Sequence, residues 1–312
     1  MQRLSEATGL VPVEFPTTRQ LGASAEARAA DVSAAFADPS IRAILATIGG
    51  DDQITVIPHI DADVVAANPK PFLGYSDNTN LHNFLWTLGV PSYYGGSTQV
   101  HLGPGPHIDA VHLASLRAAL LDGGVIELTE PGESEDFGIP WTDPRAISEF
   151  GVREPTEPWT WAGPSSSVQG KTWGGCIEVI DQIAMADRLP PLADLAGAIL
   201  LMETSEELPS ADEVKRWVRG LGERGVLEIV AGVLLARPPV SELNSAVPSA
   251  AERAELRAAQ RDVVIEQVTR YNPAAVICVG VPFGHTRPQW IIPYGSTIRL
   301  DAKVRTVTAD YS

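Results

Sequence analysis

The first 125 residues alternate between short apolar runs and amphipathic stretches. The apolar runs in IRAILATIGG, PKPFLGYS and VPSYYGG are short and end in glycine or serine, which predicts buried strands. Apolar residues recur with helical spacing over residues 23–37, 61–68, 79–89 and 107–124, which predicts helices. Short strands that alternate with helices indicate a parallel sheet covered on both faces, so we expect an N-terminal α/β domain over residues 1–130.

The second half of the chain has a different pattern. Residues 131–170 are rich in Pro, Glu, Ser and Trp and show no period, so we expect a linker with short strands and mobile loops. Residues 171–312 mix helical patterns with apolar runs that predict strands in AGAILLMETSE, VLEIVAGVLLARP and AAVICVGVPFGH. The tail over residues 290–310 alternates like an antiparallel hairpin. We therefore expect a mixed α+β C-terminal domain over residues 171–312.

Composition narrows the range of functions. The chain of 312 residues has a formal net charge of −16, and such an acidic surface repels phosphate backbones and anionic lipids, so neither nucleic acid nor a membrane is an expected partner. No apolar run reaches the roughly 18 residues of a membrane span, and the first residues lack the apolar core of a signal peptide. We therefore expect a cytoplasmic protein. Its two cysteines, Cys176 and Cys278, belong to no CxxC pair and are expected to be small buried residues, so we expect no metal and no other cofactor.

Four predicted strand ends carry residues suited to chemistry. Gly49-Gly50 follows the first apolar run and Ser76 the second, while Glu203 and His285 end two later runs. Ligands of open α/β sheets gather at the carboxyl ends of strands, so these residues form one candidate site. Each also has a simpler interpretation, since a diglycine is most often a turn and a histidine at a strand end is as often structural as functional. The other five histidines are expected on a helix face or at the surface: His59, His82, His101, His107 and His112.

Ser76 has two interpretations that this stretch leaves open. As an N-cap it would accept a backbone N–H and contribute about 1 kcal/mol to helix stability. As a nucleophile it would gain from the positive end of the helix and from N–H groups that stabilise an oxyanion. The surrounding GYSDN differs from the hydrolase elbow GxSxG at position 78, and the stretch alone favours the cap.

Several segments taken together resemble the L,D-carboxypeptidase family of serine peptidases, which includes the microcin C self-immunity peptidases. They span most of residues 25–300, in the family's order and spacing. The matching segments are RAADVSAAFADPSIRAILATIGGDDQ, PKPFLGYSDNTNLHNFLWTLGVPSYYGG, TWGGCIEVI, AILLMETSEELPSADEVKRWV and GVPFGHTRPQWIIPYGSTIRLD.

The resemblance implies a fold and a mechanism. The expected fold is α/β, with an N-terminal parallel-sheet, flavodoxin-like domain and a C-terminal mixed α+β, swivelling barrel-like domain; the active site lies between them in a homodimer. The family's Ser-Glu-His triad falls on Ser76, Glu203 and His285. His285 would then deprotonate Ser76, Glu203 would orient and stabilise the imidazolium, and the N–H groups of Asp77 and of the Gly49-Gly50 turn would form the oxyanion hole.

Three functions follow from the resemblance. The segment TIGGDDQ looks more like the microcin-immunity branch, which cleaves the bond between an aminoacyl or peptidyl group and a modified nucleotide. Trp161 and Trp173 lie in or beside the linker, where one could stack on a base or simply pack, as could Trp159. The alternatives are an L,D-carboxypeptidase that trims muropeptide tetrapeptides and a catalytically impaired binding homologue.

The start of the chain departs from the family pattern. The family opens with a strand that this chain lacks, so Met1 falls within what should be the first helix and VPVEF, residues 11–15, should form the second strand. We therefore expect the N-terminal sheet to lack its first strand, which would leave an exposed edge or a gap.

Overall fold

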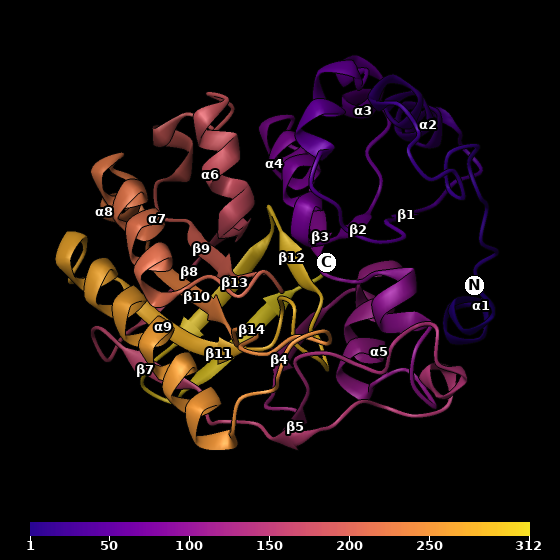
Figure 1. The fold of residues 1–312 in the computed structure, drawn as a ribbon. Coiled ribbons are helices and arrows are strands. Elements are labelled where there is room, and N and C mark those ends of the chain that lie inside the picture. The colour runs from indigo at the N-terminus through magenta and orange to yellow at the C-terminus, as the bar shows by residue number, and fades with distance from the viewer.

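The computed structural model describes residues 1–312 and contains two principal sheets. One sheet has four strands in the order β1-β2-β3-β12, and the other has eight in the order β4-β14-β13-β8-β9-β10-β11-β7. They form the cores of an N-terminal and a C-terminal domain that lie side by side (Figure 1). None of the helices combines the length and hydrophobicity that crossing a bilayer requires.

The N-terminal sheet confirms the predicted parallel arrangement. Strands β1 (Ile44–Leu45), β2 (Phe72–Gly74) and β3 (Ser92–Tyr94) are parallel, and they coincide with the three predicted apolar runs. The helices of this domain are α1 (Gln2–Thr8), α2 (Ala25–Ala37), α3 (Ala62–Ala67), α4 (Thr79–Thr87) and α5 (Ala110–Arg117), which continues as a π-helix to Asp122. The apolar sides of α2, α3 and α4 pack around Phe72 of β2 in a small core of their own.

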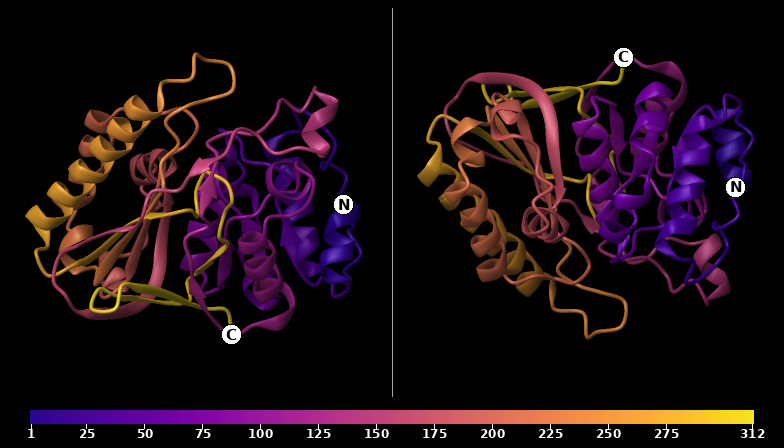
Figure 2. Two further views of the ribbon diagram at one scale, coloured as in Figure 1. Left: turned by 90° about the horizontal axis from the view of Figure 1, so that it is seen from below. Right: turned by 90° about the horizontal axis from the view of Figure 1, so that it is seen from above.

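The C-terminal sheet has a parallel centre and antiparallel flanks. Strands β8 (Ser167–Cys176), β9 (Ile199–Glu203), β10 (Gly232–Ala236) and β11 (Val276–Val281) are parallel, and the tail forms the predicted hairpin, β13 (Thr297–Asp301) with β14 (Thr306–Asp310). The helices of this domain are α6 (Ile177–Met185), α7 (Ala211–Glu223), α8 (Val226–Ile229) and α9 (Ala250–Tyr271). Helices α7 and α9 pack together on the side away from the N-terminal domain (Figure 2).

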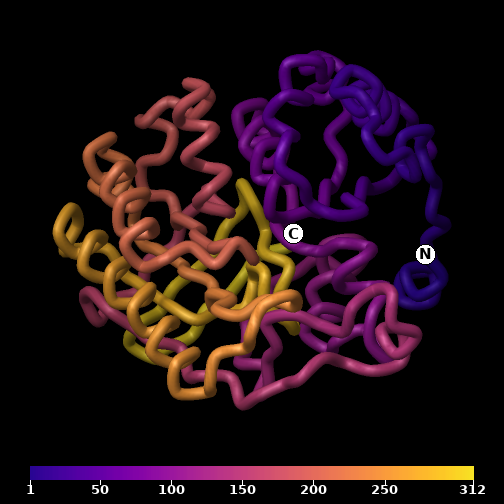
Figure 3. Tube along the Cα trace, in the orientation of Figure 1, coloured from indigo at the N-terminus to yellow at the C-terminus, as the bar shows by residue number.

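Three strands lie in sheets that the predicted domain boundaries do not suggest. The boundaries themselves stay a prediction. Strand β12 (Ile292–Tyr294) leaves the C-terminal half of the chain and pairs with β3 in the N-terminal sheet. Strands β4 (Val125–Leu128) and β7 (Thr160–Ala162) belong to the eight-stranded sheet. The C-terminus lies between the two domains, whereas the N-terminus, with α1, lies at the outer edge of the N-terminal domain (Figure 3).

Two predicted strands are wrong. Residues 11–15 form no strand, because no neighbouring strand offers them hydrogen bonds. Residues 226–229 form helix α8 before β10 begins, since an apolar run this short has no period that separates helix from strand.

The free edge of β1 borders a large cavity. No strand precedes β1 in the chain, and β1 pairs only with β2. An open cavity of about 620 Å³ lies against residues 43–49 and is lined mainly by apolar side chains, including those of α1, α2 and the segment between them. The expected exposed edge therefore faces a partly apolar cavity rather than a neighbouring strand.

The predicted linker contains the expected short strands β5 (Glu133–Ser134), β6 (Glu154–Pro155) and β7. It is also anchored by buried charges. Asp136 forms ion pairs of 2.8 Å with both Arg237 and Arg257 of the C-terminal domain, and Glu154 and Glu157 complete the network.

Candidate active site

The turn between β2 and α4 holds Ser76 in an unusual backbone conformation. Its φ is 64°, in the left-handed region that serine rarely adopts and that costs of the order of 1–3 kcal/mol. Its side chain caps neither the 3-10 turn at Ser76–Asn78 nor α4, so the capping interpretation is wrong. The backbone N–H of Ser76 instead donates to the Tyr94 hydroxyl at 3.2 Å. A strained turn of this kind between a strand and a helix is typical of serine nucleophiles.

The Gly49-Gly50 turn lies directly against Ser76. A Cβ atom placed on Gly49 would lie 2.9 Å from the Ser76 Cβ, 3.0 Å from its Oγ and 3.7 Å from the Asp77 nitrogen, so only glycine permits this approach. The buried Asp77 carboxylate accepts hydrogen bonds from the Gln53 N–H at 2.8 Å and from Asn80 at 3.0 Å, and it thereby holds the loop that follows the glycines. The structure thus brings Gly49, Gly50 and Asp77 together with Ser76.

Glu203 and His285 form a direct pair. Glu203 is the last residue of β9 and is 1% exposed, while His285 follows β11. The Nδ1 atom of His285 lies 2.6 Å from Glu203 Oε2. Burial raises the pKa of the Glu203 carboxyl, and the contacts with His285 and Tyr94 oppose that shift. Such a pair fixes the orientation of the imidazole and leaves Nε2 for proton transfer.

The turn that carries Ser76 contacts His285 through the preceding residue, but no hydrogen bond joins Ser76 to His285. The ring of Tyr75, the residue before Ser76, packs edge-on against the His285 ring with centroids 4.9 Å apart. The buried Nε2 atom of His285 has no hydrogen-bond partner. It lies 2.9 Å from Glu206 Oε2, outside hydrogen-bond geometry, so this contact is an ion pair. Catalytic hydrogen bonds are often long in unliganded enzymes, so the missing contact is compatible with a Ser-His pair that tightens on binding.

The sequence interpretation missed two residues of this site. Tyr94, on β3 and fully buried, accepts the Ser76 N–H and donates its own hydroxyl proton to Glu203 Oε1 at 2.6 Å. Pairing of β3 with β2 places Tyr94 opposite Gly74, near Ser76. Its contact with Glu203 could be predicted only if the position of β9 were also known. Glu206 lies in the turn after β9 with a 69% exposed side chain, which from the sequence alone looks solvated, but its carboxylate reaches His285.

The predicted substrate-binding tryptophans differ in position. Trp173 lies within β8, is 1% exposed and donates its indole N–H to Asn83, so the prediction that its ring stacks on a substrate is wrong. It packs in the core because β8 is a central strand and no part of the linker. Trp161 is partly buried on β7, opposite Cys278, and its role in substrate binding stays a prediction.

Three of the other histidines are buried. His82 is hydrogen-bonded to Ser92 and to the Gly74 carbonyl, and burial lowers its pKa to about 4, so it is a satisfied core residue. The surface prediction is wrong for His101 and His112, whose rings stack at 4.8 Å inside the protein. It is confirmed for His59 and His107, which are exposed. Cys176 and Cys278 are both free and buried, as predicted.

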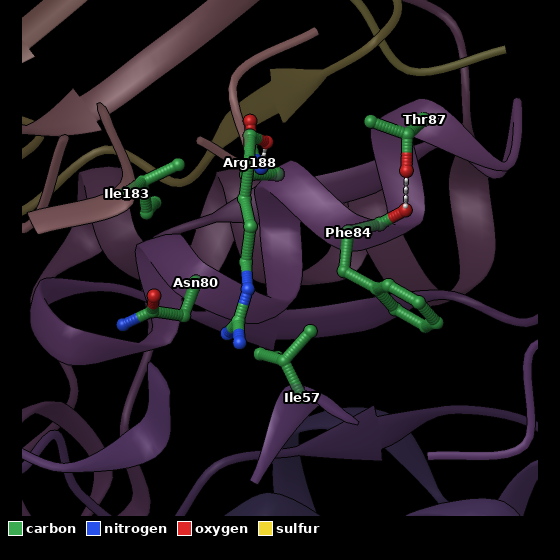
Figure 4. Close-up of a pocket in the computed structure, with 7 residues that line it drawn as sticks. Ile57, Asn80, Phe84, Thr87, Ile183 and Arg188 are labelled. Carbon is green, nitrogen blue, oxygen red and sulfur yellow. Dashed lines mark hydrogen bonds between the residues drawn. The ribbon is translucent and has the colours of Figure 1, made fainter. Parts of the chain in front are cut away.

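A separate small cavity of about 170 Å³ marks a contact between the domains (Figure 4). The Arg188 side chain extends from the segment after α6 and donates to the Ile54 carbonyl at 2.7 Å. Asn83 of α4 donates to the Arg188 carbonyl at 2.8 Å. None of the residues of the candidate site lines this cavity. No group of three or more His, Cys, Asp or Glu side chains is arranged to hold a metal ion.

Comparison with known proteins gives matches in both domains. A family model described as the LD-carboxypeptidase N-terminal domain matches residues 1–95, and one described as the LD-carboxypeptidase C-terminal domain matches residues 169–300. The Microcin C7 self-immunity protein MccF of Escherichia coli is 25% identical over 277 residues, which cover 88% of this chain and 75% of that protein. A probable murein peptide carboxypeptidase of Bacillus subtilis is 24% identical over 285 residues, which cover 91% of this chain and 76% of that protein.

The fold is also that of a solved structure. The structure of MccF in complex with aspartyl sulfamoyl adenosine superimposes with a TM-score of 0.80 at 22% identity, over 96% of this chain and 85% of that one. The mixed α/β architecture, with a parallel-sheet N-terminal domain and a mixed-sheet C-terminal domain, is therefore shared with that protein.

Proposed function

Because the chain belongs to the LD-carboxypeptidase family, we propose that it is a serine hydrolase with Ser76 as nucleophile, His285 as base and Glu203 as the orienting carboxylate. The proposal rests above all on the 2.6 Å contact between His285 Nδ1 and Glu203, which leaves Nε2 without a hydrogen-bond partner beside the strained Ser76 turn. We further propose that it works in the cytoplasm as a homodimer. Analytical ultracentrifugation tests the homodimer, because the measured mass should be twice the 33.3 kDa of one chain.

The proposed reaction proceeds in two steps. His285 Nε2 accepts the Ser76 proton while Oγ attacks the carbonyl carbon, and the N–H groups of Gly50 and Asp77 stabilise the oxyanion. His285 then protonates the leaving nitrogen, the C–N bond breaks, and an acyl-Ser76 remains. Water, deprotonated by His285, attacks this ester and releases the carboxylic acid and the free serine.

For the substrate we propose an aminoacyl or peptidyl group joined through an amide-type bond to a modified nucleotide. The similarity to MccF supports this choice, since the solved MccF complex holds aspartyl sulfamoyl adenosine. The similarity to a probable murein peptide carboxypeptidase supports a second candidate, the trimming of muropeptide tetrapeptides.

A substrate panel tests both the chemistry and the substrate. Wild type and Ser76→Ala are incubated with aspartyl sulfamoyl adenosine and with a muropeptide tetrapeptide, and products are separated by chromatography. We expect wild type to hydrolyse the nucleotide and Ser76→Ala to lose at least about 10⁴-fold in kcat, as other serine hydrolases do without their nucleophile. The control, Ser165→Ala, changes an exposed serine outside the site and should retain wild-type activity.

The other outcomes discriminate among the alternatives. Turnover of the tetrapeptide alone would favour the murein function. Binding of the nucleotide without turnover by wild type would favour a binding homologue. Full activity of Ser76→Ala, with an unchanged thermal transition, would remove Ser76 as the nucleophile.

A further inference from the structure

The His285 ring lies between two carboxylates that follow the same strand. Glu203, at the end of β9, contacts Nδ1 at 2.6 Å, and Glu206, three residues later, contacts Nε2 at 2.9 Å. The His285 side chain is only 7% exposed, whereas that of Glu206 is 69% exposed. One carboxylate is therefore buried and fixed, and the other reaches the ring from solvent.

Glu206 has no other partner to hold it. No hydrogen bond connects its side chain to a second residue, and its one ion pair is with His285. The backbone of the turn that carries Glu206 is anchored, because the Glu178 carboxylate accepts hydrogen bonds from the Ser205 N–H at 2.8 Å and from the Ser205 hydroxyl at 2.9 Å. The backbone is thus anchored while the Glu206 side chain is free to exchange one cation for another.

The ion pair has a consequence for catalysis. Burial lowers the pKa of His285, but Glu203 and Glu206 together outweigh this and raise it to about 10, while the contact with His285 lowers the pKa of Glu206 to about 2. The other polar groups near the ring are the Tyr75 phenol and, beyond it, His101 and Arg287. A general base must be unprotonated at the working pH. Glu203 contributes most to favouring the imidazolium, and the Glu206 carboxylate at Nε2 adds to it, so removal of the Glu206 charge makes Nε2 a better proton acceptor.

We propose that Glu206 binds the free α-ammonium group of an aminoacyl substrate. When its carboxylate moves from His285 to that ammonium, Nε2 becomes free to accept the Ser76 proton. This inference rests on the proposed serine hydrolase function and specifies its substrate.

The covalent geometry of an aminoacyl group fits this role. Its α-nitrogen is about 2.5 Å from the carbonyl carbon, by standard backbone dimensions. That carbon must lie about 3–3.5 Å from the Ser76 Oγ, whose proton passes to Nε2. The ammonium therefore lies within a few Å of Nε2, in reach of a carboxylate that already lies 2.9 Å from that atom.

The same argument separates the two candidate substrates. In an aminoacyl nucleotide the α-nitrogen beside the cleaved carbonyl is a charged ammonium. In a tetrapeptide that nitrogen is an amide, carries no charge and cannot replace the imidazolium as the partner of Glu206. Glu206 thus favours cleavage after a free amino acid over cleavage after an acylated residue.

The test compares aspartyl sulfamoyl adenosine with its N-acetyl derivative, in wild type, Glu206→Gln and Glu207→Gln. We expect wild type to prefer the free amine in kcat/KM by about 10–100-fold, equivalent to roughly 1.4–2.7 kcal/mol, and Glu206→Gln to reduce this ratio to about 3-fold or less. Removing an anion from beside the imidazolium lowers the His285 pKa, so the acidic limb of kcat/KM for the N-acetyl substrate should move to lower pH by about one unit. Glu207, exposed in the same turn and without an ion pair, is the matched control and should leave both quantities unchanged.

Each remaining outcome has one meaning. If Glu206→Gln keeps the wild-type ratio and pH limb, or if Glu207→Gln changes them equally, the inference is wrong while the serine hydrolase function stands. If Ser76→Ala remains active, the proposed function fails and this inference with it. The Glu206 side chain is 69% exposed and its one ion pair is with His285, so its substitution should change the thermal transition only slightly.

Discussion

At the scale of single residues, the Tyr94 hydroxyl joins the two halves of the candidate site. It accepts the N–H of Ser76 and donates to Glu203, so the strained turn and the orienting carboxylate are held by one oxygen atom. The hydroxyl is buried, where hydrogen bonds to a charged group are strongest and unpaired groups are most costly. Tyr94 therefore acts as a positioning residue, through Ser76 and Glu203 rather than on the substrate.

Tyr94→Phe should lower kcat more than it changes KM. The substitution leaves Glu203 Oε1 and the Ser76 N–H without a partner, which should reduce the free energy of unfolding by about 1–3 kcal/mol. It also removes a contact that favours the Glu203 carboxylate, so the pKa of Glu203 rises and the imidazolium loses support. We expect kcat to fall by roughly 10–100-fold, a change of the size seen when a catalytic group is misplaced. Steady-state kinetics across pH measure this change.

The neighbouring Tyr93 gives the matched control. Its hydroxyl donates to the Tyr311 carbonyl at 3.4 Å and does not contact the site. Tyr93→Phe should therefore keep kcat and its pH profile. Equal losses in the two variants would mean that Tyr94 only packs.

Sequence reasoning located the residues at strand ends but not the contacts between their side chains. Ser76, Glu203 and His285 stand out because each follows a buried run. The capping interpretation of Ser76 failed because its backbone angle depends on the Gly49 turn and on Tyr94, both distant in the sequence. Glu206 was missed for a similar reason, since an exposed glutamate in a turn looks solvated until the position of His285 is known.

At the scale of elements, the hydrophobic pattern predicted best where a strand is buried on both faces or a helix has a clear period. Helix α2 and strands β2, β9 and β11 fall where the pattern placed them. Helix α8 was mistaken for a strand because an apolar run of four residues fits either period. The anchoring of the linker could not be predicted at all, since Asp136 finds its arginine partners about one hundred positions away.

Asp136→Asn should release the linker from the C-terminal domain. It removes the most buried of the three carboxylates that Arg237 and Arg257 share, while Glu154 and Glu157 still pair with both, so the cost should be about 1–3 kcal/mol. Burial raises the pKa of Asp136, but the two arginines outweigh it and lower the pKa overall. Its contribution to stability is thus present above the unfolded value, about 3.9, and is lost as the pH falls through the lower folded value.

Urea denaturation at several pH values measures this effect. The stability gap between wild type and Asp136→Asn should be full at pH 7 and shrink below about pH 4. Asp143→Asn, which breaks an exposed pair with Arg145, is the control and should change stability little at any pH. A gap that persists unchanged into acid would mean that Asp136 stabilises the fold without its charge.

At the scale of the whole molecule, the candidate site exists only because two domains are docked. Ser76 belongs to the N-terminal sheet, Glu203 and His285 to the C-terminal one, and β12 crosses from the second chain half into the first sheet. Local patterns cannot give this docking, because it depends on side chains that meet across the interface. The resemblance to a family supplied the joint assignment that the separate patterns left open.

Asn83→Leu tests whether this docking is maintained by the contacts that Asn83 makes with the C-terminal domain. Asn83 of α4 accepts the Trp173 indole N–H at 3.1 Å and donates to the Arg188 carbonyl at 2.8 Å, so one side chain of the N-terminal domain satisfies two groups of the other. Leucine has a similar volume and no polar atoms, so both groups lose their partner at a cost of about 1–3 kcal/mol each. We expect faster amide hydrogen exchange in both α4 and β8, and a lower kcat/KM because Ser76 and His285 are held together less firmly. Asn68→Ala is the control, since Asn68 donates only to Val64 within its own helix and should change exchange in α3 alone. Faster exchange confined to α4 in the Asn83 variant would mean that the domains are held together by β12 and not by this contact.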